Sequence, residues 1–291
     1  MKRLATFLLA LAACVLTAGC NLERLAYSNA AFAYANAAPP ALKWMVGDYV
    51  DLSGEQKDWL RERVDAAFAW HRAQELPQYQ QFCEALAARA ADGFTVEQAR
   101  QANKELRAYY NRTLDHVIPD LADLLLRLDA EQVAQLERKF AKDNAKMVRD
   151  SREGTLEERN AARAKKYTGH LEEFVGSLSD AQLAIVEARA SRYDDMTEMR
   201  LADRQYRQAE TLRMIRARVS RDEMIAGLHR LLVDTQSWRS AEYRQKLRER
   251  EENMFAMIAE VSGTLTPAQR THLAERMRGF IDDIGTLVAS R

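Results

Sequence analysis

Cysteine is scarce in this sequence, and the few cysteines present cannot build a disulfide framework. The 291 residues contain 3 cysteines, at Cys14, Cys20 and Cys83. Cys14 lies inside an N-terminal apolar run that is removed if the run is a signal peptide, and Cys20 stands where the run ends. An exported chain left with Cys83 alone has no partner for an internal disulfide. We expect Cys83 to be a small buried apolar residue; a reactive thiol or an intermolecular bridge is the alternative.

An excess of one charge sign is missing as well. The chain has 43 basic and 43 acidic residues, and without residues 1–19 it has 41 and 43, a net charge of −2. Such a balance provides no basic field for nucleic acid, so we expect no nucleic-acid partner. After residue 20 there is also no apolar run of the ~20 residues that a membrane-spanning helix needs.

Signatures of catalysis and metal binding are absent too. There is no serine-nucleophile motif, no glycine-rich phosphate loop and no nucleotide-binding fingerprint. The five histidines form no H-x-H or H-E-x-x-H pair, and the nearest approaches to ligand spacing are His116 with Asp120 and His170 with Glu173. We interpret these pairs as ordinary surface contacts. We therefore expect no metal site, no cofactor and no enzyme activity.

What is present at the N-terminus is a short export signal. A basic pair at residues 2–3 precedes a nearly unbroken apolar run over 4–16, which is too short to span a bilayer but suits a signal-peptide core. The run ends in "LTAGC", and this stretch resembles the lipobox of bacterial lipoproteins, although Thr17 stands where leucine is commonest. The resemblance implies a signal peptide over 1–19 and a lipidated Cys20. An ordinary secretory signal is the alternative.

Lipid on Cys20 would hold the mature chain at a membrane surface without any spanning helix. One acyl chain gives marginal membrane residence, while two or more anchor stably at ~0.8 kcal/mol per buried CH₂. The sorting rule of such lipoproteins implies the outer membrane, because Asn21 rather than aspartate follows the cysteine. We therefore expect an exported protein that is lipid-anchored to the outer membrane and faces the periplasm.

Beyond residue 40 the pattern is helical throughout. Apolar residues step by three and four, and no segment alternates apolar and polar residues as a half-buried strand does. The 11 glycines and 5 prolines fall mainly at breaks between helical segments, and short turns favour antiparallel neighbours. The sequence therefore predicts an all-α bundle of about eight to ten helices without a sheet. One predicted core stripe is Tyr206, Ala209, Leu212, Ile215 and Val219.

The domain organisation follows from this pattern. We expect a lipidated, Ala-rich lead-in over 20–40 and a single all-helical domain over 41–291, with 152–156 as the candidate sub-boundary. Pro77 and Pro119 should kink or interrupt their helices, because proline lacks an amide donor and clashes with the preceding turn. The expected helices are 41–91, 96–127, 130–151, 156–176, 180–218, 221–234, 238–261 and 267–289.

One short phrase recurs where helices are expected to begin. "LTPAQ" from Leu265 has relatives in "LSGEQ" from Leu52, "LDAEQ" from Leu128 and "LSDAQ" from Leu178. The second residue suits a helix cap that accepts from the third helical amide, while the glutamine reaches back to the amide of the cap. The leucine suits a hydrophobic staple onto the first turns. The expected caps and their partners are Ser53–Gln56, Thr95–Gln98, Asp129–Gln132, Thr155–Glu158, Ser179–Gln182, Ser220–Glu223 and Thr266–Gln269.

Two family resemblances accompany these motifs. The recurring phrase resembles the paired L-T-x-x-Q motifs of the Spy/CpxP group, all-helical periplasmic proteins that act as ATP-independent chaperones or envelope-stress modulators; this chain is longer than that group. A second resemblance covers more of the chain. "DYVDLSGEQ" from Asp48 and "WHRAQELP" from Trp70 are similar to runs of an uncharacterised family of proteobacterial lipoproteins. That resemblance implies an exported helical lipoprotein of no known activity.

The best candidate for a functional cluster is Trp70, His71, Arg72 and Glu75, ahead of Pro77. Its alternative is a packed tryptophan with surface charges and a proline that sets a bend. The leading hypothesis is a membrane-tethered protein that binds other envelope proteins, as a chaperone-like or envelope-maintenance factor of undetermined oligomeric state. The alternative is an envelope enzyme acting on cell wall or lipid through a site assembled from scattered helices. A deep cleft lined by carboxylates or His71 would favour the enzyme, and a shallow apolar or charged cradle would favour binding.

Overall fold

The computed structural model describes Tyr34, residues 38–90 and residues 92–289, and in these residues every regular element is helical. The all-α prediction is thereby confirmed. Cys20 and the predicted signal peptide lie outside the described residues. The elements are α3 (Ala38–Gly47), α4 (Gly54–Trp70), the π-helical turn η3 (His71–Glu75), α5 (Leu76–Ala90), α6 (Val96–Leu126), α7 (Ala130–Arg152), α8 (Leu156–Val175), α9 (Asp180–Ala190), α10 (Thr197–Arg216), α11 (Arg221–Leu232), the 3-10 turn η4 (Thr235–Ser237), α12 (Ala241–Gly263) and α13 (Pro267–Ala289).

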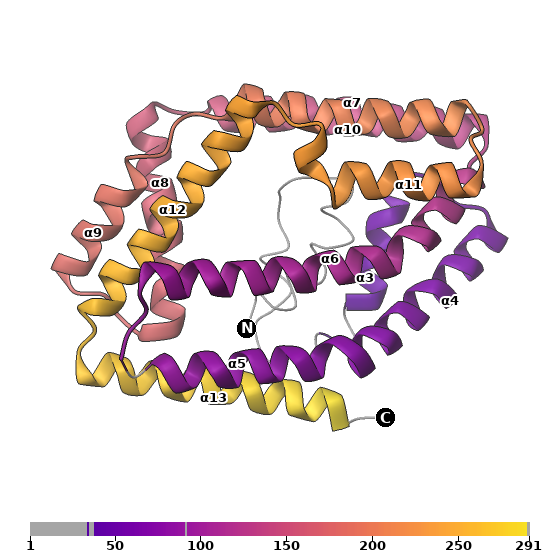
Figure 1. The fold of residues 1–291 in the computed structure, drawn as a ribbon. Coiled ribbons are helices and arrows are strands. Elements are labelled where there is room, and N and C mark those ends of the chain that lie inside the picture. Colours follow the sequence, from indigo (N-terminus) through magenta and orange to yellow (C-terminus); the bar gives the residue numbers. More distant parts are fainter. Residues whose placement is uncertain (1–33, 35–37, 91, 290–291) are drawn as a thin grey trace.

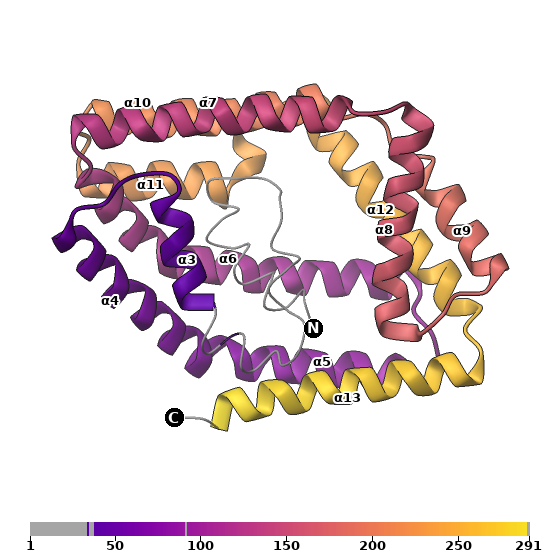
Figure 2. The same cartoon turned by 180° about the vertical axis from the view of Figure 1, so that it is seen from behind.

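These helices are laid out as an elongated frame (Figures 1 and 2). Helices α7 and α10 form one long edge, while α5 and α13 form the opposite edge. Helices α8, α9 and α12 close one end, and α4 and α11 stand at the other, with α6 running lengthwise between the two edges. None of the described helices joins the length and the apolar character that a membrane crossing requires.

The buried apolar side chains form two cores. The first core draws on the loop before α4, on α4, the C-terminal half of α6, α7, the end of α10 and α11, and includes Leu114 and Met224. The second core draws on α5, α8, α9, the end of α12 and α13, and includes Val186 and Ile284. Helix α6 contributes to both, because Leu106 packs against the second core while Leu114 lies in the first. The two cores therefore share one helix as a common wall.

The predicted helix caps are confirmed. At Ser53, Thr95, Asp129, Thr155, Ser179 and Ser220 the side chain accepts from the third helical amide, and that residue's side chain accepts from the cap's own N–H. Thr266 and Gln269 exchange the same two bonds, at 3.2 and 3.0 Å. The four leucines before caps are all buried, and the repeated phrase places two in each core: Leu52 and Leu128 in the first, Leu178 and Leu265 in the second.

The glutamines of this phrase also pair with one another, which the sequence analysis did not foresee. Gln56 Nε2 donates to Gln132 Oε1 at 3.0 Å, and Gln132 Nε2 donates to Gln56 Oε1 at 2.7 Å. The second pair repeats the exchange, with Gln182 and Gln269 donating to each other at 3.0 and 2.9 Å. Each glutamine also donates to the carbonyl two residues before its partner's cap: Arg127, Asp51, Thr264 and Ser177, respectively.

Only glutamine can do this work at the third helical position. Its oxygen accepts from its own cap and from its partner, and its NH₂ group donates twice, so the whole amide is satisfied. Glutamate could serve the cap but would bring no donor and would set two carboxylates against each other. Three caps form the local box alone: Thr95 with Gln98, where no second glutamine faces it, and the glutamate caps Thr155 with Glu158 and Ser220 with Glu223. The glutamine therefore joins the starts of two helices, besides capping its own.

Two expected helices are in fact each two helices. The helix predicted over 41–91 is broken at 48–53, where Tyr49, Val50 and Leu52 turn into the first core. The helix predicted over 180–218 is broken between α9 and α10, where Tyr193 and Met196 are 4% and 3% exposed. The first break is bordered by Gly47 and Gly54, while the second contains neither proline nor glycine, so apolar anchors end α9 there.

The predicted interruption at Pro119 and one predicted core stripe also need correction. Pro119 lies inside α6, which continues through it, so this proline does not interrupt its helix. Tyr206 is 38% exposed and stacks on Trp238 instead of entering the core. The buried face of α10 includes the polar residues Asp203, Arg204, Gln208 and Thr211, which a search for apolar periodicity passes over.

Candidate functional site

The predicted cluster over 70–75 lies on a π-helical turn that Pro77 explains. Proline cannot donate to the carbonyl four residues earlier, and its ring clashes with that carbonyl. The chain widens by one residue immediately upstream, so that the Leu76 N–H bonds to the His71 carbonyl five residues before it. The rod from α4 to α5 therefore continues through Pro77 with an altered turn.

His71 lies on this turn in a buried pair of tyrosine contacts. Its side chain is 5% exposed, and its Nδ1 and Nε2 lie 2.9 Å from Tyr34 Oη and 3.3 Å from Tyr79 Oη. Burial, together with repulsion from the neighbouring His116, lowers the pKa of His71 to about 4. Near neutral pH the ring is uncharged, so one nitrogen donates and the other accepts.

Glu75 and Trp70 tie the same rod to α6. Glu75 is 2% exposed and receives two hydrogen bonds from Arg112, at 3.0 and 2.9 Å. The Trp70 ring stacks on His116 with a centroid separation of 3.7 Å and an interplanar angle of 6°. Arg72 acts on Tyr34 through its charge. The four predicted side chains thus lie near one another between α4, α5 and α6, but each of them interacts with a different partner.

The opening motif "DYVDLSGEQ" ties the loop before α4 to α7. Tyr49 Oη donates to Asp143 Oδ2 at 3.0 Å, and burial together with the Asp143 charge raises the pKa of Tyr49. Asp48 pairs with Lys139 at 2.7 Å. The backbone N–H of Asp51 donates to Gln135 at 2.9 Å. Each of these contacts fixes the loop in which the first core begins.

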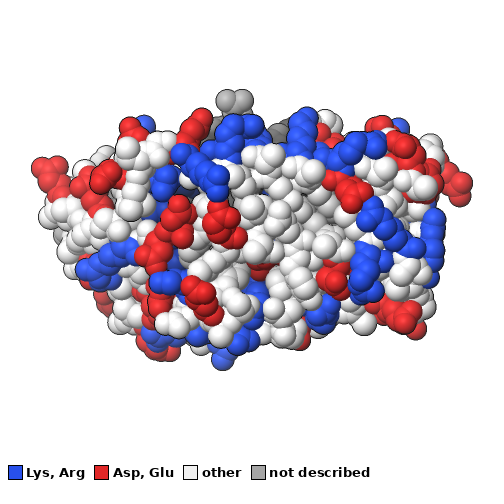
Figure 3. Space-filling model, turned by 90° about the horizontal axis from the view of Figure 1, so that it is seen from above, with Lys and Arg blue, Asp and Glu red and all other residues white. Residues whose placement is uncertain are grey.

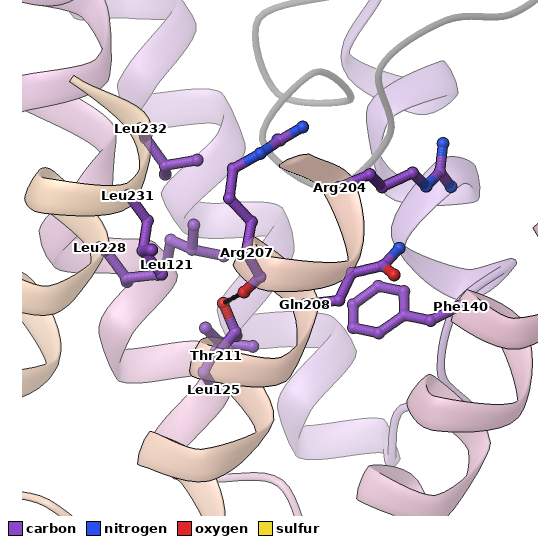
Figure 4. Close-up of a pocket in the computed structure, with 10 residues that line it drawn as sticks. All are labelled: Leu121, Leu125, Phe140, Arg204, Arg207, Gln208, Thr211, Leu228, Leu231 and Leu232. Carbon is purple, nitrogen blue, oxygen red and sulfur yellow. Dashed lines mark hydrogen bonds between the residues drawn. The ribbon is translucent and has the colours of Figure 1, made fainter. Parts of the chain in front are cut away.

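A small cavity lies between α6, α7, α10 and α11, with leucines of α6 and α11 on one side and Arg204, Arg207 and Gln208 of α10 on the other (Figure 4). Its volume of about 10 Å³ is close to what one water molecule needs. Arg204 is 3% exposed and lies 3.8 Å from Asp143, while its Nε and Nη2 have no hydrogen-bond partner. The cavity is therefore a place for a bridging water rather than for a substrate.

Two open grooves are larger. One lies between α7 and α10, measures about 630 Å³ and has mainly apolar walls such as Val148 and Leu201. The other lies between α6 and α12, measures about 900 Å³ and has Phe255 among charged and amide side chains. Arg100 bonds to both carboxylate oxygens of Glu252 across this second groove, at 3.0 and 2.7 Å. Neither groove is lined by His71 or by any other member of the predicted cluster.

A family model for a family of unknown function, DUF6279, matches residues 48–244. The chain belongs to this family. No curated protein and no solved structure matches the chain. The predicted resemblance to an uncharacterised family is thereby confirmed, while no match supports kinship with the Spy/CpxP group.

The DUF6279 match begins at Asp48 and contains both quoted motifs, so the residues that carried the resemblance are those that tie the rod and its loop to α6 and α7. In the part of this DUF6279 chain that the structure describes, no three His, Cys, Asp or Glu side chains gather as a metal site would require. His116 is occupied with Trp70, and Glu173 pairs with Arg276 at 3.0 Å. Cys83 is free and 8% exposed, which confirms it as a small buried residue, and burial raises the pKa of its thiol to about 11.

Sequence reasoning missed the polar network on the buried side of α10. Asp203 receives bonds from Arg207 at 3.2 Å and from Arg239 at 2.6 Å, and Asn144 of α7 donates to Gln208 at 2.8 Å. The available signal was the number of charged and amide residues in "LADRQYRQAETLR". They are too many to lie on the solvated face of one helix, so some of them must be buried. Buried polar groups need partners from other helices, and one sequence does not show those partners.

Proposed function

We propose that this DUF6279 chain is a periplasmic lipoprotein, anchored to the outer membrane through lipidated Cys20, that binds other envelope proteins. The lipobox and Asn21 support the anchor and its membrane. The open groove between α6 and α12 carries the binding role, because its walls offer both charge signs around an apolar side chain. A protein segment with a mixed-charge face and one apolar anchor suits such a groove.

The charge pattern of the outer surface fits a protein partner. In the view of Figure 3, basic and acidic side chains lie side by side with uncharged areas between them, and no broad field of one sign covers the face. Within the groove, Arg100 and Arg107 of α6 pair with Glu252 and Glu251 of α12. A partner can exchange with these exposed ion pairs at little cost, because exposed pairs are worth only about 0–1 kcal/mol.

The same geometry leads us to propose binding rather than catalysis. An enzyme site built around the predicted cluster would need His71 or Glu75 to reach a bound substrate. Both side chains are buried, and both are engaged by neighbouring side chains, Tyr34 and Tyr79 for His71 and Arg112 for Glu75. The larger openings lie elsewhere, along α6 and α12 and along α7 and α10.

Cys20→Ser tests the anchor. Wild-type protein should take up labelled fatty acid and sediment with outer-membrane fractions. The variant should take up none and move to the soluble periplasmic fraction. Persistence of the variant in the membrane would contradict the lipid anchor.

Site-directed crosslinking in cells tests the binding role. A photo-reactive residue at Lys104 or Gln245, which line the groove between α6 and α12, should give discrete crosslinks to envelope proteins identified by mass spectrometry. The matched control is the exposed Lys57 on α4, which is not among the groove's lining residues. Crosslinks that are absent, or that are the same from Lys57 as from the groove, would sink the proposal.

A further inference from the structure

Two arginines from two helices lie against one buried tyrosine, and a third arginine lies near both of them. Tyr193, in the turn between α9 and α10, is 4% exposed. The guanidinium carbon of Arg250, from α12, lies 4.2 Å from the centroid of its ring, and that of Arg163, from α8, lies 5.2 Å from the same centroid. Arg200, in the first turn of α10, is close enough for its charge to repel both of the other two. We call Arg163, Arg200 and Arg250 the arginine cluster.

The arginine cluster has too little negative charge around it. In the described part of the chain, neither Arg200 nor Arg250 forms an ion pair, and Arg163 bonds only to uncharged oxygens, those of Asn160 and the Ala190 carbonyl. The carboxylate that acts on Arg163 and Arg200 is that of Asp195. It already accepts from Arg159 at 3.3 Å and from the backbone N–H of Thr197 at 2.9 Å.

This arrangement is costly for the free protein. Desolvation lowers the pKa of Arg163, and repulsion from Arg250 lowers it further. The pKa of Arg200 is lowered by the same causes, desolvation first and then repulsion from Arg250 and Arg163. Yet Arg200 remains exposed to solvent and the other two are only half-buried. A ligand from solvent can therefore still reach these guanidinium groups.

We propose that the arginine cluster is a binding site for a phosphate-type oxyanion. A dianion placed between the three guanidinium groups would replace their mutual repulsion with charge-assisted hydrogen bonds. Arginine suits this role because its planar fork matches the oxygen pairs of a phosphate, and because it stays protonated despite the lowered pKa. The ring of Tyr193 packs against the guanidinium groups of Arg163 and Arg250 and helps to position them.

The number of arginines favours phosphate over a carboxylate. One guanidinium group satisfies a carboxylate through two parallel hydrogen bonds, as Arg112 does for Glu75. Three guanidinium groups from separate helices carry more positive charge than one carboxylate can balance, which favours an anion with two negative charges. A free phosphate and the phosphomonoester group of a lipid headgroup share this chemistry.

Calorimetric titration of the purified full chain with inorganic phosphate tests the site, with sodium chloride at matched ionic strength and acetate as reference anions. Wild-type protein should bind phosphate saturably and unfold at a higher temperature in its presence. Arg200→Gln and Arg250→Gln should each weaken phosphate binding at least tenfold. The control Arg213→Gln removes an exposed arginine from the same helix, where it pairs with Glu210, and should bind phosphate as the wild type does.

A second measurement separates a lost ligand from a damaged fold. In phosphate-free buffer Arg200→Gln should unfold at the same temperature as wild-type protein or a higher one, because the substitution removes repulsion. In phosphate buffer only wild type and Arg213→Gln should gain stability. Failure of wild-type protein to bind phosphate, or equal binding by Arg200→Gln and Arg213→Gln, would overturn the proposal.

Vesicles distinguish the two sources of the anion. Soluble Cys20→Ser protein is incubated with vesicles of phosphatidylglycerol or of phosphatidylcholine bearing a phosphomonoester lipid. Co-sedimentation that depends on Arg200 and is competed by free phosphate would assign the site to a lipid headgroup. Phosphate binding without vesicle binding would assign it to a free phosphate or phosphorylated solute. Both results support the oxyanion site, while vesicle binding unaffected by Arg200→Gln counts against it.

Discussion

The Gln56–Gln132 and Gln182–Gln269 pairs perform the same task in two different surroundings. In each pair the glutamines cap their own helices and exchange hydrogen bonds with each other. Each glutamine also donates to the carbonyl two residues before its partner's cap. The first pair lies in the first core, beside a loop that polar contacts hold to α7. The second pair lies in the second core, where Gln182 is 1% exposed and Leu178 and Leu265 flank it.

The surroundings show two ways to stabilise one motif. Beside the first pair, Tyr49 donates to Asp143 and Asp48 pairs with Lys139. The loop therefore keeps these tertiary contacts when the hydrogen bonds between the glutamines are lost. Gln182 instead donates to Gln269 and to both oxygens of Thr264, at 3.2 and 3.3 Å. The second pair should therefore tolerate substitution less well than the first.

Gln182→Glu should have the largest effect, a loss of about 3 kcal/mol in the free energy of unfolding. The carboxylate keeps the cap bond but loses the NH₂ group that donates to the Gln269 amide oxygen and the Thr264 carbonyl, at a site with almost no solvent. Urea denaturation followed by circular dichroism measures the loss. Glu223→Gln, the matched control at an unpaired and exposed box, should leave the transition unchanged. Similar behaviour of the two variants would show that the amide pair is not stabilising.

The rod that connects the two cores should make stability depend on pH. Val64 lies in the first core, Leu76 lies in the second, and His71 stands between them. Its pKa is about 4 in the fold against 6.5 in the unfolded chain, so between these values the unfolded chain binds more protons. Stability should therefore fall as pH drops from 6.5 to 4, with a contribution from His71 of up to about 3 kcal/mol.

The substitution His71→Gln isolates this contribution, because glutamine can still bond to Tyr34 and Tyr79 but does not titrate. Denaturation at pH 7.5 and at pH 4.5 should show a smaller drop for the variant than for wild-type protein. Equal drops in the two proteins would mean that His71 titrates in the fold as it does in water.

Gln132→Glu applies the first substitution to the other core and should cost about 2 kcal/mol. Gln132 donates to two oxygens, those of Gln56 and the Asp51 carbonyl, rather than to three, and it is 5% exposed. Urea midpoints of the two variants, compared in the same buffer, give the ranking. A larger loss for Gln132→Glu than for Gln182→Glu would reverse the comparison between the cores.

Tyr49→Phe should have the smallest effect, about 1 kcal/mol, because it removes one hydrogen bond while the ring stays in the first core. The informative measurement is the double variant with Gln132→Glu. If the tyrosine contact holds the loop in place when the glutamine pair is lost, the double variant should lose more stability than the sum of the two single losses. Strict additivity would mean that the contact and the glutamine pair act independently.

Local sequence patterns predicted most of the helices and all seven caps, since a capping box depends on residues three apart in the chain. The staple leucines followed from the same spacing, and their burial confirms it. What local patterns could not supply was the partner of each helix start. Nothing in "LSGEQ" and "LDAEQ" states that Gln56 meets Gln132, because that contact depends on how α4 and α7 pack.

The errors have the same origin. The break before α10 depends on the burial of Tyr193 and Met196 against other helices, and no glycine or proline in the sequence indicates it. The arginine cluster joins residues from α8, α10 and α12 that read separately as solvated charges. Trp70, His71, Arg72 and Glu75 were predicted as a group because they lie close together along the chain ahead of Pro77, and whether they serve a function stays a prediction.

The packing of α13 on α5 has a consequence for how the protein is made. The face of α5 is synthesised within the first third of the chain, but its cover is the last helix of 23 residues, Pro267–Ala289. A chain that emerges progressively from the ribosome therefore leaves Leu76 and Phe82 uncovered until its C-terminus is made. Truncation of the final helix should accordingly yield an aggregation-prone, protease-sensitive product, because the apolar face of α5 loses its cover.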